Sequence, residues 1–155
     1  MRLTRFSDIG LRVLIYLERA GERPHPVTAA EIASQFSIPH NHMVKVVGHL
    51  VRAGWVKALR GRNGGLRLAA DPQLLTVGQV LCELEGDDEL VDCEATRCAL
   101  SLDCHLRGVL KAGMRAFYAE MDRHTLAGIT GGSTGEQIVR MHSMFWSGTT
   151  VAGTA

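Results

Sequence analysis

The pattern over residues 28–70 constrains the fold more than any other part of the sequence. A capping-box motif at Thr28–Glu31 begins a short amphipathic segment, Pro39 interrupts it, and a second amphipathic segment runs to Gly54. Two short helices joined by a turn of about three residues are typical of a helix-turn-helix, whose second helix can enter a DNA major groove. Short alternating runs on either side of the glycine-rich turn 61–65 then predict a β-hairpin. Together these features predict a mainly α winged helix-turn-helix with one small β-hairpin.

The chain divides into three segments of different composition. We expect residues 1–74 to form the winged helix-turn-helix DNA-binding domain, with the helix-turn-helix at about 28–53 and the wing at about 55–70. Residues 75–128 contain all four cysteines and then a helical stripe with a broad apolar face, which predicts a cysteine-bearing cluster loop followed by a long dimerisation helix. Gly, Ser and Thr become frequent in residues 129–155, so we expect a weakly ordered C-terminal tail.

The net charge of +1 hides an opposition between the two halves of the chain. Residues 1–72 carry 11 basic and 5 acidic side chains, a balance of +6, whereas residues 73–155 carry 6 basic and 11 acidic side chains, a balance of −5. Such asymmetry indicates contact with nucleic acid or a membrane surface, and the first half is the anion binder. The sequence has neither an apolar run of the roughly 20 residues that cross a bilayer nor a secretory signal, so we expect a cytoplasmic protein.

Polar and basic side chains crowd the outer face of the second helix of the helix-turn-helix and the tip of the hairpin. Asn can pair with adenine, Lys with guanine or phosphate, and Arg on a wing can reach the minor groove or its phosphates. A solvated polar face is the alternative for the helix, and Asn63 can simply hold the turn. The candidate DNA-binding residues are His40, Asn41, His42, Lys45, Arg60, Arg62 and Asn63.

Three cysteines have the spacing of metal ligands. Cys93, Cys98 and Cys104 supply soft thiolates from one loop and the start of a helix, the ligand type that iron-sulfur clusters and zinc prefer. A structural zinc site or unligated thiols are the alternatives, but zinc loops favour C-x2-4-C pairs closed by a nearby fourth Cys or His. Cys82 stands apart on a predicted apolar helix, where we expect a small buried side chain.

Catalytic motifs are missing from the sequence. No Ser, His or Asp lies in a nucleophile motif, and no glycine-rich loop precedes a helix as a nucleotide site requires. A thiol-based redox enzyme would need two nearby cysteines that cycle through a disulfide. We therefore expect a DNA-binding protein and not an enzyme.

Several short stretches of the chain together match the pattern of one known family. They are Met1-Arg2-Leu3-Thr4, Asp8, Gly10-Leu11-Arg12, Asn41-His42-Met43-Val44-Lys45, Arg60-Gly61-Arg62-Asn63-Gly64-Gly65 and Glu83-Leu84-Glu85. On these stretches, residues 1 to about 128 resemble the Rrf-type winged-helix regulators, a family that carries iron-sulfur clusters, and in particular its nitric-oxide-sensing repressors. The resemblance implies a homodimeric repressor that binds a pseudo-palindromic operator and leaves it when the cluster reacts with nitric oxide. Relatives that respond to iron, oxygen or redox stress are the nearest alternative.

The resemblance also implies the ligands of the cluster. They would be the three cysteines at 93, 98 and 104 of one subunit and Asp8 of the other. The cluster-biogenesis regulators of the family instead use a His three positions after the last Cys, and Arg107 stands there in this chain. A 4Fe-4S cluster is therefore favoured over 2Fe-2S.

Asp8 has a second partner available within its own helix. A carboxylate in a first helical turn is favoured by the helix dipole, and Arg12 stands at i+4 to pair with it. We expect Asp8 to ligate the intact cluster and to turn to Arg12 when the cluster is lost. The two residues would then form the switch between the cluster and the DNA-binding half.

Overall fold

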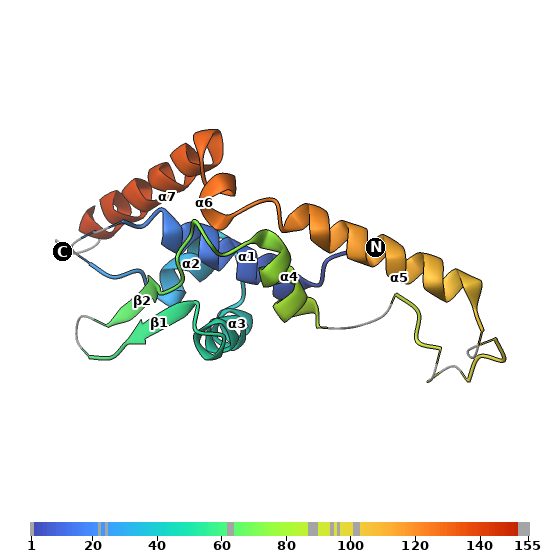
Figure 1. The fold of residues 1–155 in the computed structure, drawn as a ribbon. Helices are drawn as coiled ribbons and strands as arrows, with labels where there is room; N and C mark the ends of the chain where they lie inside the picture. The colour runs from blue at the N-terminus through green and yellow to red at the C-terminus, as the bar shows by residue number, and fades with distance from the viewer. Residues whose placement is uncertain are drawn as a thin grey trace.

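The computed structural model describes residues 2–21, 23, 25–61, 64–86, 90–93, 95, 97–100 and 103–151. These residues form, in chain order, α1 (Arg5–Glu18), α2 (Ala29–Gln35), α3 (His40–Arg52), β1 (Val56–Leu59), β2 (Gly65–Leu68), α4 (Val77–Glu85), α5 (His105–Met121), α6 (Leu126–Ile129) and α7 (Gly132–Val151). Helices α1 to α4 and the hairpin make one body, α5 extends from it to one side, and α7 lies back over α1 and α2 (Figure 1). The fold is thus mainly α with one antiparallel hairpin, as the sequence predicts.

Helices α1, α2 and α3 bury one apolar stripe each and enclose the core. Helix α3 contributes side chains at spacings of 3 and 4, which is the period that places residues on one helical face. The turn between α2 and α3 contains Ser37 at φ 52, a left-handed conformation that ends α2 sharply. The central core side chains, all less than 3 % exposed, are Ile9, Val13, Leu14, Ile32, Met43, Val46 and Leu50.

The hairpin is fixed to the helix-turn-helix by a third short extended segment. Strands β1 and β2 pair in antiparallel register from Val56–Leu68 to Leu59–Gly65. The Leu66 N–H donates to the carbonyl of Val27, just before α2, at 2.6 Å. A Cβ at Gly65 would lie 2.6 Å from that same carbonyl, so the close approach requires glycine. The wing therefore cannot shift without moving the start of the helix-turn-helix.

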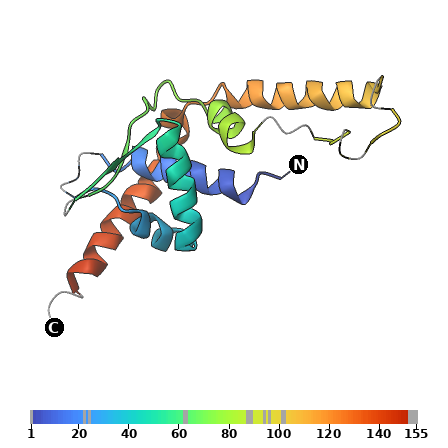
Figure 2. The same ribbon diagram turned by 90° about the horizontal axis from the view of Figure 1, so that it is seen from below.

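Helix α5 leaves the body at a fixed base and is otherwise uncovered. A complete capping box, Thr76 with Gln79, begins α4, and the Thr76 hydroxyl also donates to Asp122 at the end of α5, at 2.6 Å. None of the residues of α5 is buried. Both ribbon views show α5 projecting beyond the winged helix (Figures 1 and 2). No helix in the described part of the chain combines the length and the apolar character needed to span a membrane.

The C-terminal segment corrects an expectation from the sequence. Residues 129–155 were expected to form a weakly ordered tail, but Gly132–Val151 form the longest helix of the described chain. Ile138, 5 % exposed, joins the core cluster. Despite the high Gly, Ser and Thr content, one apolar stripe of this segment packs against α1 and α2, and packing outweighs weak helix propensity.

Candidate DNA-binding surface and metal-ligand segment

Helix α3 presents its predicted DNA-binding residues on the face opposite the core. His40, Asn41 and Lys45 are exposed and His42 is half-buried. The Asn41 side-chain oxygen accepts a hydrogen bond from the His42 N–H at 2.9 Å, so its amide nitrogen points outward as a donor. Pro39 precedes the helix and offers no side-chain cap, which leaves the N-terminal end of α3 available to an anion such as a phosphate.

The wing carries basic side chains beside those that the sequence singled out. Arg60 is exposed at the end of β1, whereas Arg62 and Asn63 lie outside the described residues. Lys57 and Arg67, which the sequence analysis missed, are directly paired across the two strands and both exposed. Like charges that face one another across a sheet destabilise it unless an anion lies near. The period-2 alternation of the strands is the signal that could have identified this pair.

Asp8 and Arg12 form the ion pair that their spacing predicts. The Arg12 Nε lies 3.0 Å from both carboxylate oxygens of Asp8, and both side chains are about half exposed. The Arg12 guanidinium also lies over the ring of Phe36, 5.6 Å from its centre. Phe36 is the C-cap of α2, at the turn of the helix-turn-helix. One arginine thus joins the predicted metal ligand Asp8 to the DNA-binding motif.

The three candidate cysteine ligands lie in the segment before α5. Cys93, Cys98 and Cys104 are half-buried, and none of the four cysteines forms a disulfide. The Cys98 N–H donates to the Cys93 carbonyl at 3.1 Å, and Cys104 is the N-cap of α5 without a side-chain cap hydrogen bond. Cysteine sulfur is the ligand type that iron-sulfur clusters use. The donor chemistry fits an iron-sulfur cluster.

One described chain does not gather a complete ligand set. Within the described residues, no three His, Cys, Asp or Glu side chains lie close enough together to hold a metal ion. Asp8 lies on α1, whereas the three cysteines lie between α4 and the start of α5. The role of these four residues as ligands stays a prediction that requires a second subunit.

Cys82 is exposed, so the expectation that it is buried was wrong. Val80, Leu81 and Leu84 form the buried face of α4, and Cys82 points away from it. Its side chain borders a groove of about 500 Å³ between α4, Leu90 and α5. When a helix packs against other elements on one side, the residues next to its apolar stripe remain exposed to solvent.

The last turn of α4 contacts both α1 and α3. Glu83 pairs with the His49 Nε2 of α3 at 2.9 Å, and Glu85 accepts from the Thr4 N–H at the start of α1 at 2.8 Å. Partial burial acts to raise the pKa of Glu85, but hydrogen bonds from Ser7 and Thr4 outweigh it and lower the pKa. The helix that precedes the cysteine segment is therefore anchored to α1 and α3.

Comparison with known proteins identifies this architecture. The profile of the family described as "Rrf2: Iron-dependent Transcriptional regulator" matches residues 3–131. The chain belongs to the Rrf2 family. It is 39 % identical over 132 residues to the HTH-type transcriptional regulator NsrR of Bacillus licheniformis, covering 83 % of this chain and 92 % of that protein.

Solved structures share the Rrf2 fold. A putative transcriptional regulator from Listeria innocua is 27 % identical, with a TM-score of 0.66 over 86 % of this chain and 89 % of that one. CymR, described as the global cysteine regulator of B. subtilis, is 25 % identical, with a TM-score of 0.60 over 83 % of this chain and 95 % of that one. The chain is thus a DNA-binding transcriptional regulator of the Rrf2 family and not an enzyme, and the resemblance found in its sequence is confirmed.

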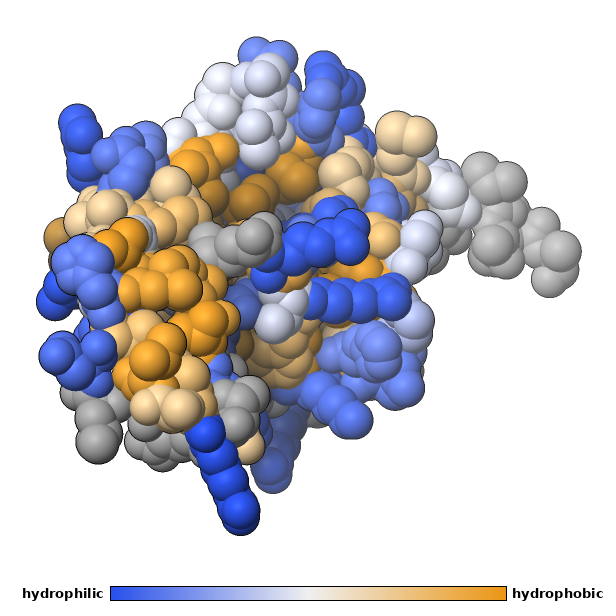
Figure 3. Space-filling view, turned by 90° about the vertical axis from the view of Figure 1, so that its right-hand side faces the viewer, coloured by the Kyte–Doolittle hydropathy of each residue, from blue (hydrophilic) through white to orange (hydrophobic). Residues whose placement is uncertain are grey.

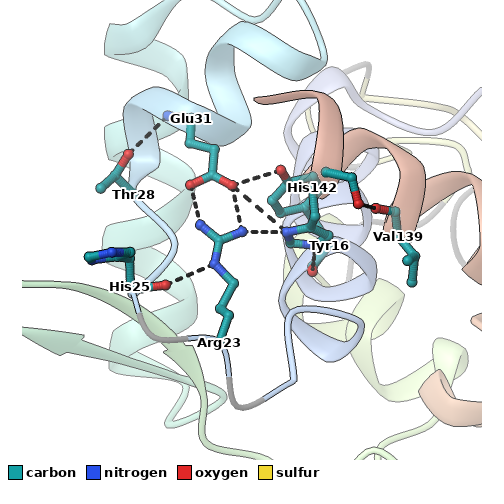
Figure 4. A network of polar contacts seen from close by, with 8 residues as sticks. Tyr16, Arg23, His25, Thr28, Glu31, Val139 and His142 are labelled. Atoms are coloured by element: carbon teal, nitrogen blue, oxygen red, sulfur yellow. Dashed lines mark hydrogen bonds and ion pairs between the residues drawn. The ribbon is translucent and has the colours of Figure 1, made fainter. Parts of the chain in front are cut away.

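The sequence analysis did not foresee a buried polar cluster that lies against α2 of the helix-turn-helix. Glu31, 1 % exposed, accepts from the Tyr16 hydroxyl at 2.8 Å and from the Arg23 Nη1 and Nη2 at 2.8 and 2.7 Å (Figure 4). The predicted capping box is therefore half formed: the Thr28 side chain accepts from the Glu31 N–H, but the Glu31 carboxylate turns to Arg23. Two charge-assisted bonds outweigh the local cap.

Proposed function

We propose that this Rrf2-family chain is a homodimeric repressor that binds a pseudo-palindromic operator and releases it in response to nitric oxide. An iron-sulfur cluster held by Cys93, Cys98 and Cys104 of one subunit and by the partner subunit's Asp8 would carry the signal. The observation that supports this most directly is the path from Asp8 through Arg12 to Phe36 in the helix-turn-helix.

Dimerisation is supported by the surface of α5. Leu106 and Val109 on α5 are 62 % and 54 % exposed, and Leu90 and Leu100, in the segment before α5, are 44 % and 66 % exposed. Figure 3 faces this end of the molecule, where apolar side chains gather over the surface. Large exposed apolar patches mark interaction sites. A second copy packed along α5 would cover this one and place Asp8 of one subunit near the cysteines of the other.

DNA recognition is assigned to α3 and the wing. His40, Asn41, His42 and Lys45 would face base edges and phosphates, and Arg60, Arg62 and Asn63 would follow the adjacent groove or backbone. In a two-fold dimer the two recognition helices must lie about 34–36 Å apart to enter successive major grooves. Operator affinity is then sensitive to any change in how α1 holds α2 and α3.

The donor set favours an iron-sulfur cluster over zinc. Three thiolates and one carboxylate provide soft ligands and a single hard, weaker one. Within that choice, Arg107 occupies the position at which the 2Fe-2S relatives would carry a His, so we propose 4Fe-4S. When bound, the cluster would supply iron that reacts with nitric oxide, and Asp8 would be its weakest protein ligand.

The chain's own residues would convert this event into a change at the DNA. Both Asp8 oxygens accept from the Arg12 Nε at 3.0 Å, so an iron that binds this carboxylate would compete with Arg12 for its charge. Release of Asp8 to Arg12 changes the position of the guanidinium over Phe36 and with it the turn between α2 and α3. Weakening by about 3 kcal/mol would lower operator affinity by roughly a hundredfold.

One titration tests the proposal. The protein is purified anaerobically and its iron and sulfide are measured. Nitric oxide is then added in steps while visible absorbance and binding to a duplex selected from a random-sequence pool are followed in the same sample. We expect the cluster absorbance and the DNA affinity to fall together, and Asp8→Ala to alter both. Glu120→Ala, which removes an exposed carboxylate of α5, is the control.

The alternatives are outcomes of the same experiment. Protein that contains zinc without iron and sulfide would refute the cluster. Cluster absorbance that falls with oxygen or iron depletion but not with nitric oxide would assign a different signal. An Asp8→Ala variant with unchanged absorbance and unchanged nitric-oxide response would show that the fourth ligand lies elsewhere.

A further inference from the structure

The buried side chain of His142 connects helix α7 to the polar cluster at the helix-turn-helix. The family profile ends at residue 131, so α7 lies outside the part of the chain that it matches. The His142 side chain is only 8 % exposed. Figure 4 shows it beside Arg23 and Glu31, between α1 and α2. The C-terminal helix is thus connected to the polar cluster that positions α2.

The contacts of His142 define its protonation state. Arg23 Nη1 lies at short hydrogen-bond distance from the His142 Nδ1, and a guanidinium can only donate. Nδ1 must therefore be an acceptor. On the other side of the ring, Nε2 lies 3.1 Å from the Tyr16 carbonyl oxygen, which can only accept. The geometry requires the neutral tautomer with its proton on Nε2.

Aromatic contacts complete the attachment of α7. The His142 ring stacks on the Tyr16 ring with centroids 4.0 Å apart. One turn further along α7, Trp146 stacks on His25 at 4.7 Å and lies 5.1 Å from the Arg23 guanidinium. Arg23 is thus held by Glu31 on one side and by two side chains of α7 on the other. Detaching α7 would remove two of the contacts that orient Arg23 and, through Glu31, α2.

We propose that α7 is a proton-sensitive clamp on the helix-turn-helix, which neutral His142 closes and protonated His142 opens. A proton on Nδ1 would point at the Arg23 guanidinium, so the hydrogen bond would be lost and two positive charges would meet. With α7 detached, Tyr16 and Arg23 lose their cover and α2 loses its fixed position. Acidification would then weaken DNA binding independently of the cluster.

The charged groups around His142 come from three elements. Tyr16 faces it from α1, Arg19, Arg23 and His25 lie in the segment that follows, and Glu31 faces it from α2. Glu31, 3.8 Å from Nδ1, is the group that favours protonation. Its oxygens already accept from Arg23 and Tyr16, which limits what it offers to a proton on His142.

The balance of these groups favours the neutral ring. Burial is the main cause that lowers the pKa of His142 below 6.5, and the Arg23 charge lowers it further, against the opposing effects of the Tyr16 carbonyl and Glu31. A detached His142 would have the higher, solvent-exposed pKa. The open form therefore takes up the proton as the pH falls through that value, and acid favours opening.

Protons have a route to the ring. A surface pocket of about 310 Å³ opens between α7 and the segment before α2, lined by Arg19, His25, Val139, His142 and Trp146. His142 can therefore equilibrate with solvent without unfolding of the core. The clamp would respond to pH within the folded dimer.

The test compares the pH dependence of DNA affinity in matched variants. Wild type, His142→Gln and the control His124→Gln, which changes an exposed histidine near Glu120, are titrated with the duplex selected at about pH 8. Affinities are measured down to about pH 5.5, the range in which histidine titrates. Other histidines, including those on α3, are present in wild type and in His142→Gln, so their direct effects cancel in the ratio of the two affinities. Cluster absorbance is recorded in each sample.

We expect the affinity of wild type to fall with acid relative to His142→Gln by up to about tenfold per pH unit for each His142 that takes up a proton. His124→Gln should follow wild type. Identical pH profiles for wild type and His142→Gln would overturn the proposal, and so would loss of the pH effect in His124→Gln alone. Since only DNA affinity is compared, failure here is distinct from failure of the nitric-oxide response.

A second measurement needs no substitution at this position. Proton NMR of the wild-type dimer identifies the His142 ring by its contact with the Tyr16 ring and follows it with pH. A titration midpoint below 6.5, together with loss of the Tyr16 contact at acid pH, is expected. A midpoint at or above that value, or a Tyr16 contact that persists after protonation, would refute the clamp even if His142→Gln did not fold.

Discussion

Arg23→Ala is expected to lower the free energy of unfolding by about 3–5 kcal/mol, the cost of removing one partner of a buried ion pair. The Glu31 side chain is 1 % exposed and the Arg23 side chain 12 % exposed, and two hydrogen bonds of 2.8 and 2.7 Å join them. Without the guanidinium, the buried Glu31 carboxylate keeps the Tyr16 hydroxyl but loses its counter-charge. Since domains are stable by about 5–15 kcal/mol, this loss is a large fraction of the total.

Urea unfolding of wild type and Arg23→Ala, followed by circular dichroism at one protein concentration, measures the difference. The concentration is kept equal because subunit association contributes to the stability of a dimer. Arg123→Ala, which removes an exposed ion pair with Glu120, is the control and should match wild type. A deficit in Arg23→Ala below about 1 kcal/mol would refute the reasoning, because that is the size expected of a solvent-exposed pair.

A double variant separates charge from shape. Arg23→Met with Glu31→Leu removes both charges and keeps side chains of similar length. Apolar replacement of a whole buried pair is often neutral or stabilising, so the double variant should recover most of the loss seen in Arg23→Ala. If it is no more stable than Arg23→Ala, the cost lies in lost packing against Trp146 or the hydrogen bond to the His25 carbonyl, and not in a buried charge.

Three further predictions test packing, exposure and assembly. Gly10→Ala places a Cβ against Leu84 and should lower the free energy of unfolding in urea by about 1–3 kcal/mol, because α1 and α4 are forced apart. Unchanged stability would mean that α4 can move away from α1 without cost. Cys82→Ser should leave stability within about 0.5 kcal/mol and cluster absorbance unchanged, and a loss of absorbance would make Cys82 a ligand. Leu106→Glu with Val109→Glu should convert the dimer to monomer in size-exclusion chromatography, and a persistent dimer would place the interface elsewhere.

Local patterns predicted the winged helix well. The stripe of Met43, Val46 and Leu50 repeats at the helical period, and all three are buried. The alternating runs around Gly61 to Gly65 pair as a hairpin because a strand period and a turn signal occur in one short stretch. Such features depend on residues a few positions apart, which a sequence displays directly.

Features that depend on distant packing were not predicted. Helix α7 is stable because Ile138 and His142 find α1 and α2, more than 100 positions earlier in the chain. Cys82 is exposed although its sequence neighbours are apolar. The sequence does not show which side of α4 other elements cover. Glu31 matched a capping box, a local pattern, but the Arg23 and Tyr16 side chains offered it stronger bonds. Sequence spacing shows which residues could form a hydrogen bond, but it does not show which of these hydrogen bonds forms.

The residues of the candidate site were named from the sequence, but the contacts that join them to other helices were not predicted. The i+4 spacing of Asp8 and Arg12 predicted their ion pair, which depends on one helix alone. That Arg12 also covers Phe36 depends on how α1 crosses α2, which no local pattern states. The cysteines could be grouped by spacing, but their assembly with Asp8 requires a second chain.

The two proposed inputs meet on the same short helix. Helix α2 has seven residues, too few to be stable alone, so its orientation depends on what holds its two ends. Arg12 covers Phe36 at its C-terminal end, and Tyr16 and Arg23 bind Glu31 in its first turn. Release of Asp8 would act at the first of these contacts and protonation of His142 at the second. Because α2 packs on α3, either change alters the angle at which the recognition helix meets DNA, and one small element can report two chemical signals.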